Sequence, residues 1–225
     1  MIGKLLSGAV KLYLRSQVER VEALQIEIEG KNKQILQGYI PQVFLSCDRA
    51  IYQGLHLSQI QLKGTDIAIN LPEVIKKQPL KLIEPIFVEI QLRLDAEDLQ
   101  ASLKSDLLQS GLNDLWQQIL AEQNFSDLAA AKVEWQHIAI ADRQLNLTGS
   151  YQDSGTAHQL ALSIKIELAN DHTLCLSPLN VTSESQSNSS LDSRLEIDLG
   201  TDIDIAKLKI EFEQIVCAGN IKVNN

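Results

Sequence analysis

The chain has 225 residues, which is enough for one large domain or two small ones. Its apolar content of 44% and charged content of 22% are typical of a soluble globular protein. The formal net charge of −9 and the aromatic content of 4% argue against a general nucleic-acid binder. Such a protein needs lysine and arginine to displace counterions, and aromatic side chains to stack on bases. Nucleic acid is therefore not an expected partner.

Residues 1–17 predict an amphipathic helix. Six apolar residues recur at helical spacing and form one stripe: Ile2, Leu5, Leu6, Ala9, Val10 and Tyr13. Lys4, Lys11 and Arg15 lie beside or opposite this stripe, in a segment without acidic residues before Glu19. Two interpretations stay open, a helix packed on a sheet and a helix lying on a membrane surface. The second predicts these membrane contacts: Ile2, Lys4, Leu5, Leu6, Lys11 and Arg15.

The same cations interrupt any hydrophobic core of a signal peptide, and no cleavage site of small residues follows. No apolar run approaches the roughly 20 residues that span a bilayer. The expected location is therefore cytoplasmic, with peripheral contact to a membrane.

Strands are expected at 20–29, 33–46 and 52–71, because apolar and polar residues alternate there with period two. In the third run, Leu55 and Leu57 share one parity, whereas Ile60 and Leu62 share the other. One extra residue near Ser58 or Gln59 would place all four apolar side chains on the same face of the sheet, so this change of parity predicts a β-bulge. A bulge bends a strand, and a bent sheet can wrap around a partner.

Pro72 starts a short helical piece, and a further alternating strand is expected at 86–94. Asp95, with Asp98 three residues later, predicts a helix cap. The next element, 96–122, is expected to be the longest helix, roughly 40 Å long, with one stripe of leucines. Such a stripe needs a broad apolar partner, and the bent sheet is the obvious one.

The remaining elements are expected strands at 132–141, 143–152, 156–169, 172–181, 194–213 and 215–224. Residues 182–192 form a polar, low-complexity stretch that predicts a mobile loop. No linker rich in proline and glycine divides the chain. The pattern therefore favours a single α+β domain over 1–225, built from sequential antiparallel strands.

The sequence contains no signature of catalysis. A nucleophile elbow, a phosphate-binding loop, a dinucleotide-binding glycine pattern and a zinc-protease motif are all missing. The three cysteines are far apart and lack zinc spacing, and the acidic cluster at 196–204 alternates with apolar residues as the outer face of a strand does. The chain is therefore expected not to be an enzyme, and neither a metal nor a cofactor is predicted.

Two long segments resemble a known family. They are LQIEIEGKNKQILQGYIPQVFLSCDRAIYQGLHLSQIQLKG at 24–64 and the following INLPEVIKKQPLKLIEPIFVEIQLRLDAEDLQASLKSDLL. With the closing DLGTDIDIAKLKIEFEQIVCAGNIKV at 198–223, they are similar to the LmeA-like phospholipid-binding family, in the form found in cyanobacteria. The resemblance implies phospholipid binding. It also implies a fold akin to tubular lipid-binding proteins, with a strongly curved antiparallel sheet around a long amphipathic helix.

The residues and the resemblance together predict a non-catalytic phospholipid or acyl-chain binding protein, acting as a carrier at a membrane surface. Six apolar residues are expected to line one lipid-binding interior: Ile26, Ile90, Leu92, Leu99, Leu103 and Leu107. The alternative is a structural or protein-interaction domain with a fully packed core and no ligand. An open apolar groove of hundreds of Å³ would favour lipid, because ordinary interiors contain few voids larger than a water molecule.

Overall fold

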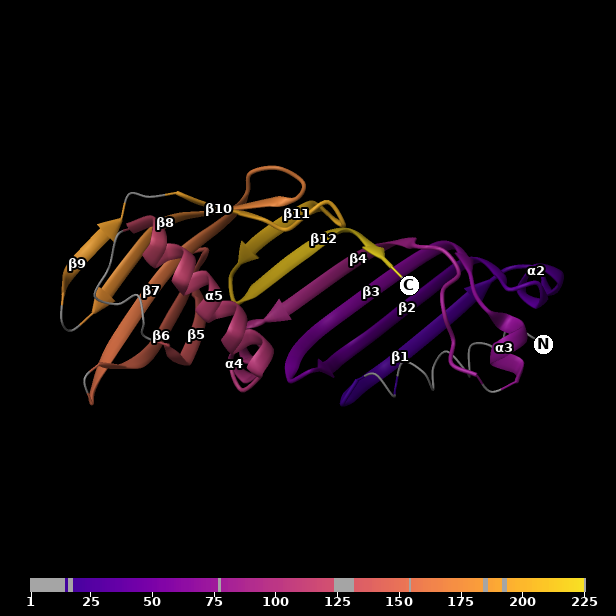
Figure 1. Ribbon diagram of the computed structural model, residues 1–225, viewed down its shortest axis with the longest axis horizontal. Coiled ribbons are helices and arrows are strands. Elements are labelled where there is room, and N and C mark those ends of the chain that lie inside the picture. Colours follow the sequence, from indigo (N-terminus) through magenta and orange to yellow (C-terminus); the bar gives the residue numbers. More distant parts are fainter. Residues whose placement is uncertain are drawn as a thin grey trace.

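The computed structural model describes residues 15, 18–76, 78–123, 132–153, 155–183, 186–191 and 194–224. Two antiparallel sheets follow one another along an elongated molecule (Figure 1). The first sheet has six strands in the order β1-β2-β3-β4-β12-β11. The second has the order β10-β8-β7-β6-β5, with β9 paired to β8. Strands dominate the described chain, as the alternating sequence predicts, and the fold is of the α+β type.

The first sheet combines the N-terminal strands with the last two strands of the chain. Its strands are β1 (Arg20–Glu29), β2 (Tyr39–Tyr52), β3 (Leu55–Ala68), β4 (Ile86–Asp95), β11 (Ile203–Glu211) and β12 (Gln214–Val223). Two short helices, α2 (Asn32–Leu36) and α3 (Leu71–Ile75), lie at one end of these strands. The predicted strand at 33–46 thus begins later than expected, because α2 occupies its first residues.

The second sheet holds the middle of the chain. Its strands are β5 (Glu134–Ala141), β6 (Gln144–Asp153), β7 (Thr156–Leu168), β8 (Thr173–Ser183), β9 (Gln186–Leu191) and β10 (Leu195–Asp198). The predicted strand at 194–213 is two strands in two different sheets. Residues 182–192, predicted as a loop, include β9, which pairs with β8. Polar segments can pair in this way, because the ladder joins backbone groups and does not need apolar side chains.

The single helix expected at 96–122 is instead two helices, α4 (Ala96–Ser102) and α5 (Asp106–Gln123). The Ser102 hydroxyl donates to the carbonyl of Asp98 at 2.8 Å, and Ser105 precedes the first turn of α5. A serine before a helix is a preferred N-cap, so Ser105 was an available signal for a new start. Asp95 does occupy the N-cap position of α4, but its side chain makes no capping hydrogen bond.

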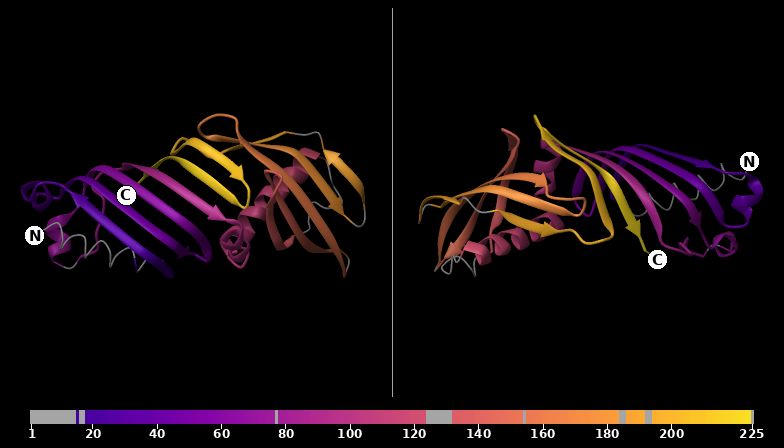
Figure 2. Two further views of the ribbon diagram at one scale, coloured as in Figure 1. Left: turned by 180° about the vertical axis from the view of Figure 1, so that it is seen from behind. Right: turned by 90° about the horizontal axis from the view of Figure 1, so that it is seen from above.

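α5 packs against the second sheet, and no described helix lies across the middle of the first (Figure 2). The expected arrangement, a long helix wrapped by the N-terminal strands, is therefore not what the structure shows. Helix α4 joins the two sheets. Its Ser102 hydroxyl accepts from the backbone amide of His56 at 2.8 Å, and the side-chain oxygen Oε1 of its Gln100 accepts from the backbone amide of Ile138 at 2.8 Å.

The predicted bulge at Ser58 or Gln59 is wrong. The β2–β3 register runs without a shift from Tyr39–Ala68 to Tyr52–Leu55. The parity change occurs in both strands at once, since Cys47 pairs with Ile60 and the next apolar pair is Ala50 with Leu57. Both pairs belong to one apolar cluster, and the register is preserved because neither strand gains a residue relative to the other. The register shifts of this region lie instead between β1 and β2.

The main core lies between the second sheet and the helices α4 and α5. Trp116 and Trp135 meet edge to face there, with ring centroids 6.5 Å apart. Leu147, Leu160, Leu162 and Ile164 are at most 1% exposed in the same cluster. The first sheet contributes only two small clusters of buried residues, one beneath α2 and α3 and one around Cys47. The two sheets therefore differ in how well their apolar faces are covered.

Candidate functional site

Aliphatic side chains form continuous rows across the first sheet. Directly opposed residues of paired antiparallel strands lie on the same face, so the registers define each row. The first row is Ile26, Leu45, Leu62, Ile90, Gly219 and Ile205. The second row is Cys47, Ile60, Leu92, Cys217 and Leu208. The third row is Ile28, Val43, Gly64, Val88, Ile221 and Ile203. We call these three rows the apolar face.

The apolar face is only partly covered. Cys47, Gly64 and Val88 are buried, whereas every other residue of the three rows is partly exposed. At about 4.8 Å between strands and 3.4 Å per residue, the rows extend roughly 24 Å across the sheet and 14 Å along it. An apolar sheet face normally packs against a second layer, and a contiguous apolar surface of this size marks a binding site.

Gly219, in the first row, allows the backbones of β11 and β12 to approach closely. A Cβ at this position would collide with the carbonyl oxygen of Asp204, because β11 shifts register between Ile205 and Lys207 and its backbone approaches closely. Only glycine leaves room for this approach. The residue therefore keeps β11 against β12, so that the first and third rows continue to the edge strand.

The opposite face of the same sheet is polar. Its central row is Gln25, Ser46, Gln61 and Gln91. The neighbouring row contains Lys63 and Glu89, whose side chains form an ion pair at 2.9 Å. A groove of about 340 Å³ runs over these residues. Phe44 and Phe87 are apolar exceptions on this face. Most side chains of the sheet nevertheless alternate between apolar and polar, which is typical of a sheet whose two faces meet different environments.

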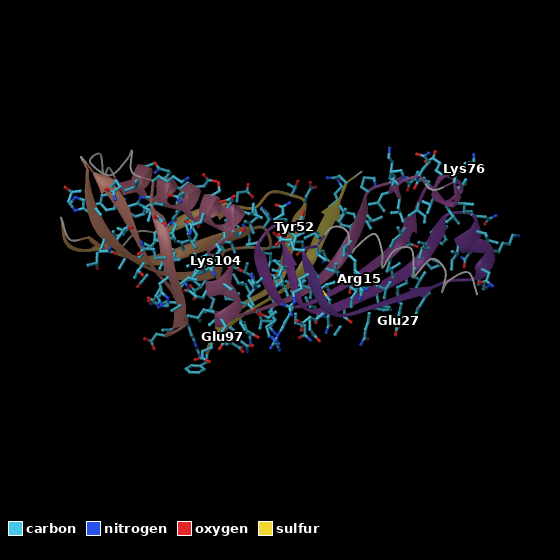
Figure 3. All side chains as sticks on the ribbon, turned by 90° about the horizontal axis from the view of Figure 1, so that it is seen from below. Arg15, Glu27, Tyr52, Lys76, Glu97 and Lys104 are labelled. Carbon is cyan, nitrogen blue, oxygen red and sulfur yellow. The ribbon has the colours of Figure 1, made fainter. Side chains whose placement is uncertain are left out.

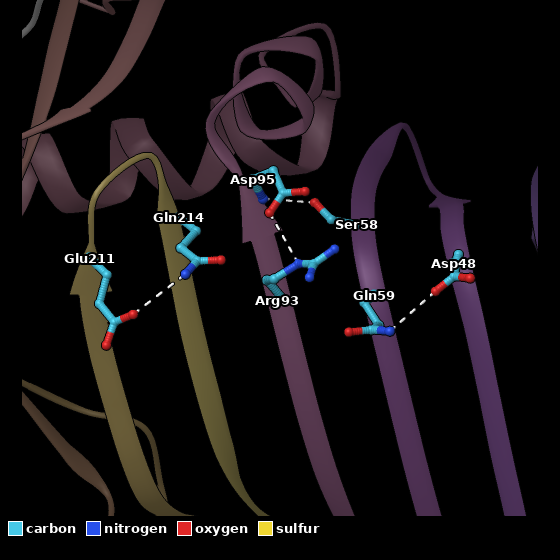
Figure 4. A network of polar contacts seen from close by, with 7 residues as sticks. All are labelled: Asp48, Ser58, Gln59, Arg93, Asp95, Glu211 and Gln214. Carbon is cyan, nitrogen blue, oxygen red and sulfur yellow. Dashed lines mark hydrogen bonds and ion pairs between the residues drawn. The ribbon is translucent and has the colours of Figure 1, made fainter.

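A larger groove of about 1110 Å³ lies where the first sheet meets α4. Charged residues line it, and the Arg93 guanidinium forms an ion pair with Asp95 at 3.1 Å (Figure 4). The Ser58 hydroxyl accepts from the backbone amide of Asp95 at 2.7 Å. The Gln59 amide donates to Asp48 at 3.3 Å nearby. This groove holds no apolar interior for an acyl chain.

Two further grooves are also lined more by polar than by apolar residues. One, of about 400 Å³, lies between β7 and β11, and the other, of about 620 Å³, follows the outer side of α5. An enclosed apolar interior is thus not among these four grooves. The apolar surface that the described residues offer is the open face of the first sheet.

Two of the three thiols lie on the apolar face. Burial raises the pKa of Cys47, with the negative charge of Asp48 adding to the effect, and burial raises the pKa of the half-buried Cys217. A raised pKa keeps both thiols neutral near pH 7, so neither is an activated nucleophile. In this environment, Cys47 and Cys217 act as small apolar side chains.

The structure divides the six predicted lipid-binding residues. Ile26 and Ile90 share the first row, and Leu92 lies in the second. Leu99 and Leu103 are instead buried in the core beneath the second sheet, and Leu107 on α5 is 47% exposed. They do not share one interior, because the helix stripe packs on the sheet that follows it along the chain. The leucine periodicity shows that the helix has an apolar stripe, but it does not indicate which of the two sheets the stripe packs on.

Five of the predicted membrane-contact residues, Ile2, Lys4, Leu5, Leu6 and Lys11, lie outside the described residues. Arg15 is described and is exposed (Figure 3). Across the described ranges, no helix combines the length and the apolarity needed to cross a bilayer. The same ranges contain no cluster of three His, Cys, Asp or Glu side chains arranged to hold a metal ion.

A family model described as LmeA-like phospholipid-binding matches residues 1–220 of the chain. The chain belongs to the LmeA-like phospholipid-binding family. The predicted resemblance is thereby confirmed, and it covers both sheets and not the N-terminal strands alone. Searches among curated proteins and among solved structures gave no match.

Membership in the LmeA-like family agrees with the chemistry of the apolar face, since acyl chains are the part of a phospholipid that such a surface can accept. Sequence reasoning missed much of this face. Strands β11 and β12 extend it with Ile205, Leu208 and Ile221, and their own alternation was visible in the sequence. The pairing of β12 with β4, across more than 100 residues of chain, was not visible in the sequence.

Proposed function

We propose that this protein is a non-catalytic phospholipid-binding protein that holds acyl chains on the apolar face and carries them at a membrane surface. The observation that carries the proposal is the set of partly exposed aliphatic rows on the first sheet. Burial of one methylene contributes roughly 0.8 kcal/mol, so six methylenes laid on this face contribute about 5 kcal/mol. The family description supports the same ligand class.

The proposal retains Ile26, Ile90 and Leu92 as acyl-chain contacts. The prediction that Leu99, Leu103 and Leu107 contact lipid is separate, because lipid would then have to reach the helices α4 and α5. Docking through residues 2–15 is a second part of the proposal, supported by their apolar stripe and their three cations.

Native mass spectrometry of protein purified from cells tests the main proposal. The wild type is expected to carry phospholipid, and Leu62→Asp is expected to lose it, because the new charge would have to be desolvated under the acyl chain. Gln61→Asp is the matched control, since Gln61 is the preceding residue of β3 and is exposed on the polar face. It is expected to keep the lipid.

Two results would overturn the proposal. One is wild-type protein that carries no phospholipid and binds none when lipid is added. The other is a folded Leu62→Asp protein with the lipid content of Gln61→Asp. Either would favour the alternative, a structural or protein-interaction domain with a fully packed core and no ligand.

A further inference from the structure

One end of the first sheet carries an unusual surface, which we call the tip. It consists of α2 with its flanking residues, 31–38, and of α3 with the segment that follows it, 71–76 and 78–85. These segments connect β1 to β2 and β3 to β4, so they lie together at the same end of the sheet, far from α4 and the second sheet (Figure 1).

The tip is an ordered surface. Its core residues Ile35 and Leu71 are 1% and 6% exposed. The side chain of Asn70 fixes the connecting segment, because its Oδ1 accepts from the backbone amide of Lys81 at 2.7 Å and its Nδ2 donates to the Glu73 carboxylate at 2.6 Å. The amide of Ile83 also donates to the carbonyl of Ala68 at 2.8 Å. The side chains of the tip are therefore presented by a fixed backbone.

Three large aliphatic side chains of the tip point away from this core. Leu36 is 53% exposed, Ile75 is 69% exposed and Ile83 is 56% exposed. Seven large hydrophobic residues are at least 41% exposed among the described residues, and three of the seven gather in these two short segments. An exposed aliphatic cluster on an ordered surface is typical of an interaction site.

The tip is also basic, on a chain of net charge −9. Its described residues include four lysines and two glutamates. Lys31, Lys33, Lys76 and Lys81 are exposed, and no described carboxylate forms an ion pair with any of them. Glu73 already accepts the hydrogen bond of Asn70. Aliphatic side chains surrounded by free lysines match the interface of an anionic bilayer.

The tip adjoins the apolar face. Ile28 and Val43 belong to the third row of that face, and both pack against the buried cluster of the tip, as does Ile86 at the start of β4. An acyl chain that leaves a bilayer beneath the tip would thus meet apolar side chains without crossing a polar surface. At the other end of the strands, Ala50 and Leu57 extend the apolar cluster around Cys47, but the groove that they reach is lined mostly by charged and polar residues.

From these observations we infer that the protein docks on anionic membranes through the tip, with Leu36, Ile75 and Ile83 entering the interface and the lysines contacting the headgroups. The inference rests on the proposed function for its purpose, which is the passage of lipid between the bilayer and the apolar face. The docking itself depends only on the tip, so the two can be tested separately.

Vesicle flotation tests the docking, with vesicles of phosphatidylcholine alone or of phosphatidylcholine and phosphatidylglycerol in equal parts. The wild type is expected to bind the anionic vesicles more strongly, and less so as salt screens the lysines. Lys31→Glu, Lys33→Glu and Lys76→Glu together are expected to weaken binding by roughly a hundredfold, given the usual attraction of each lysine to anionic lipid.

The matched control reverses three other exposed lysines, Lys104, Lys132 and Lys207, none of which forms an ion pair with a described carboxylate. It has the same net charge as the tip variant, and Lys104 lies far from Lys76 along the molecule (Figure 3). Binding close to that of the wild type is expected. Equal losses in both triple variants would show that net charge alone matters, and would overturn the inference.

A second pair of variants tests the aliphatic contacts. Ile75→Asp is expected to weaken vesicle binding at least tenfold, whereas Phe212→Asp is expected to leave it unchanged. Phe212 is 88% exposed, but it lies in the β11–β12 turn beside the opposite end of β4, roughly 30 Å from the tip at the usual rise per residue. Both residues are exposed, so both variants should fold. Equal binding by the two would contradict the inference.

Binding of a monomeric short-chain phosphatidylglycerol separates this inference from the proposed function, because it requires no membrane. The tip variants are expected to bind this lipid as the wild type does, and Leu62→Asp is expected not to bind it. Loss of monomer binding in the wild type, with tip-dependent flotation intact, would refute the apolar face and leave the tip. Monomer binding without tip-dependent flotation would refute the tip alone.

Discussion

The two sheets of this protein have similar sequence patterns and different surroundings. In the second sheet, the inward residues Leu147, Leu162 and Ile164 are at most 1% exposed, because α4 and α5 cover them. In the first sheet, the corresponding residues Leu45, Leu62 and Ile90 remain partly exposed. The helices α4 and α5 form a second layer on the second sheet, whereas no described element forms such a layer on the apolar face of the first sheet.

This difference shows that alternation alone does not distinguish a core from a binding surface. Period-two alternation fixes which side chains share a face, and the aliphatic residues are of the same kind in both sheets. What covers the face depends on where the connecting helices pack. Here the leucine stripe of 99–120 packs on the second sheet, so the described helices leave the apolar face of the first sheet open.

The largest expected effect contrasts one leucine from each sheet. Leu162→Ala is expected to reduce the free energy of unfolding by about 2–5 kcal/mol, because it leaves a cavity in a packed core. Leu62→Ala is expected to cost only about 1 kcal/mol in lipid-free protein, since its side chain is partly exposed and water can occupy the space. Urea unfolding measures both, through a change of midpoint at constant slope. Equal losses would show that the first sheet is as tightly packed as the second.

Most of the fold was predictable from the sequence, because the strands are long and regular. The expected strands at 20–29, 86–94 and 143–152 match β1, β4 and β6 to within a residue or two. The break between α4 and α5 was marked by Ser105, but the unbroken leucine periodicity outweighed it. The strand β9 could not be predicted, since the polar side chains of 186–191 carry no signal for backbone pairing.

The candidate site was predictable only in part. Ile26, Ile90 and Leu92 were found from alternation within their own strands, which is a local signal. The contribution of β11 and β12, and the separation of Leu99 and Leu103 from the first sheet, depend on contacts between distant parts of the chain. The tip could not be predicted, because its two helices are too short to show the apolar periodicity of a helix or a strand.

A smaller effect concerns Cys217, which reports on the open face. Burial raises the pKa of its thiol, so alkylation is expected to be slow at pH 7 and to accelerate as the pH rises toward that pKa. Bound lipid should slow the reaction at least tenfold by covering the second row. The rate is followed by mass spectrometry in a Cys47→Ala, Cys175→Ala background. The fluorescence of Trp116 and Trp135, in the other core, is expected to stay unchanged.

The thiol also predicts a pH dependence of stability. Because its pKa is raised in the folded protein, the unfolded chain ionises first as the pH rises. The stability that the neutral thiol contributes is thus present below the unfolded pKa and is lost as the pH approaches the folded pKa. Cys217→Ala should remove this part of the loss of stability at alkaline pH.

The alkylation experiment has its own contradicting outcome. If Cys217 is alkylated equally fast with and without lipid, the acyl chains lie elsewhere than on the second row.

The smallest expected effect concerns the segment that precedes the first sheet. Changing Lys4, Lys11 and Arg15 together to Glu is expected to weaken flotation with anionic vesicles only a few-fold. The loss is small because the four described lysines of the tip make the headgroup contacts, and cations farther than about 8 Å from the bilayer are largely screened at physiological ionic strength. Lipid already held on the apolar face should remain, as native mass spectrometry would show. If this variant loses its lipid while the tip variant keeps it, residues 2–15 cover the open sheet and hold the acyl chains in place. If it instead floats as the wild type does and keeps its lipid, these residues make no contact with the membrane, and docking is left to the tip.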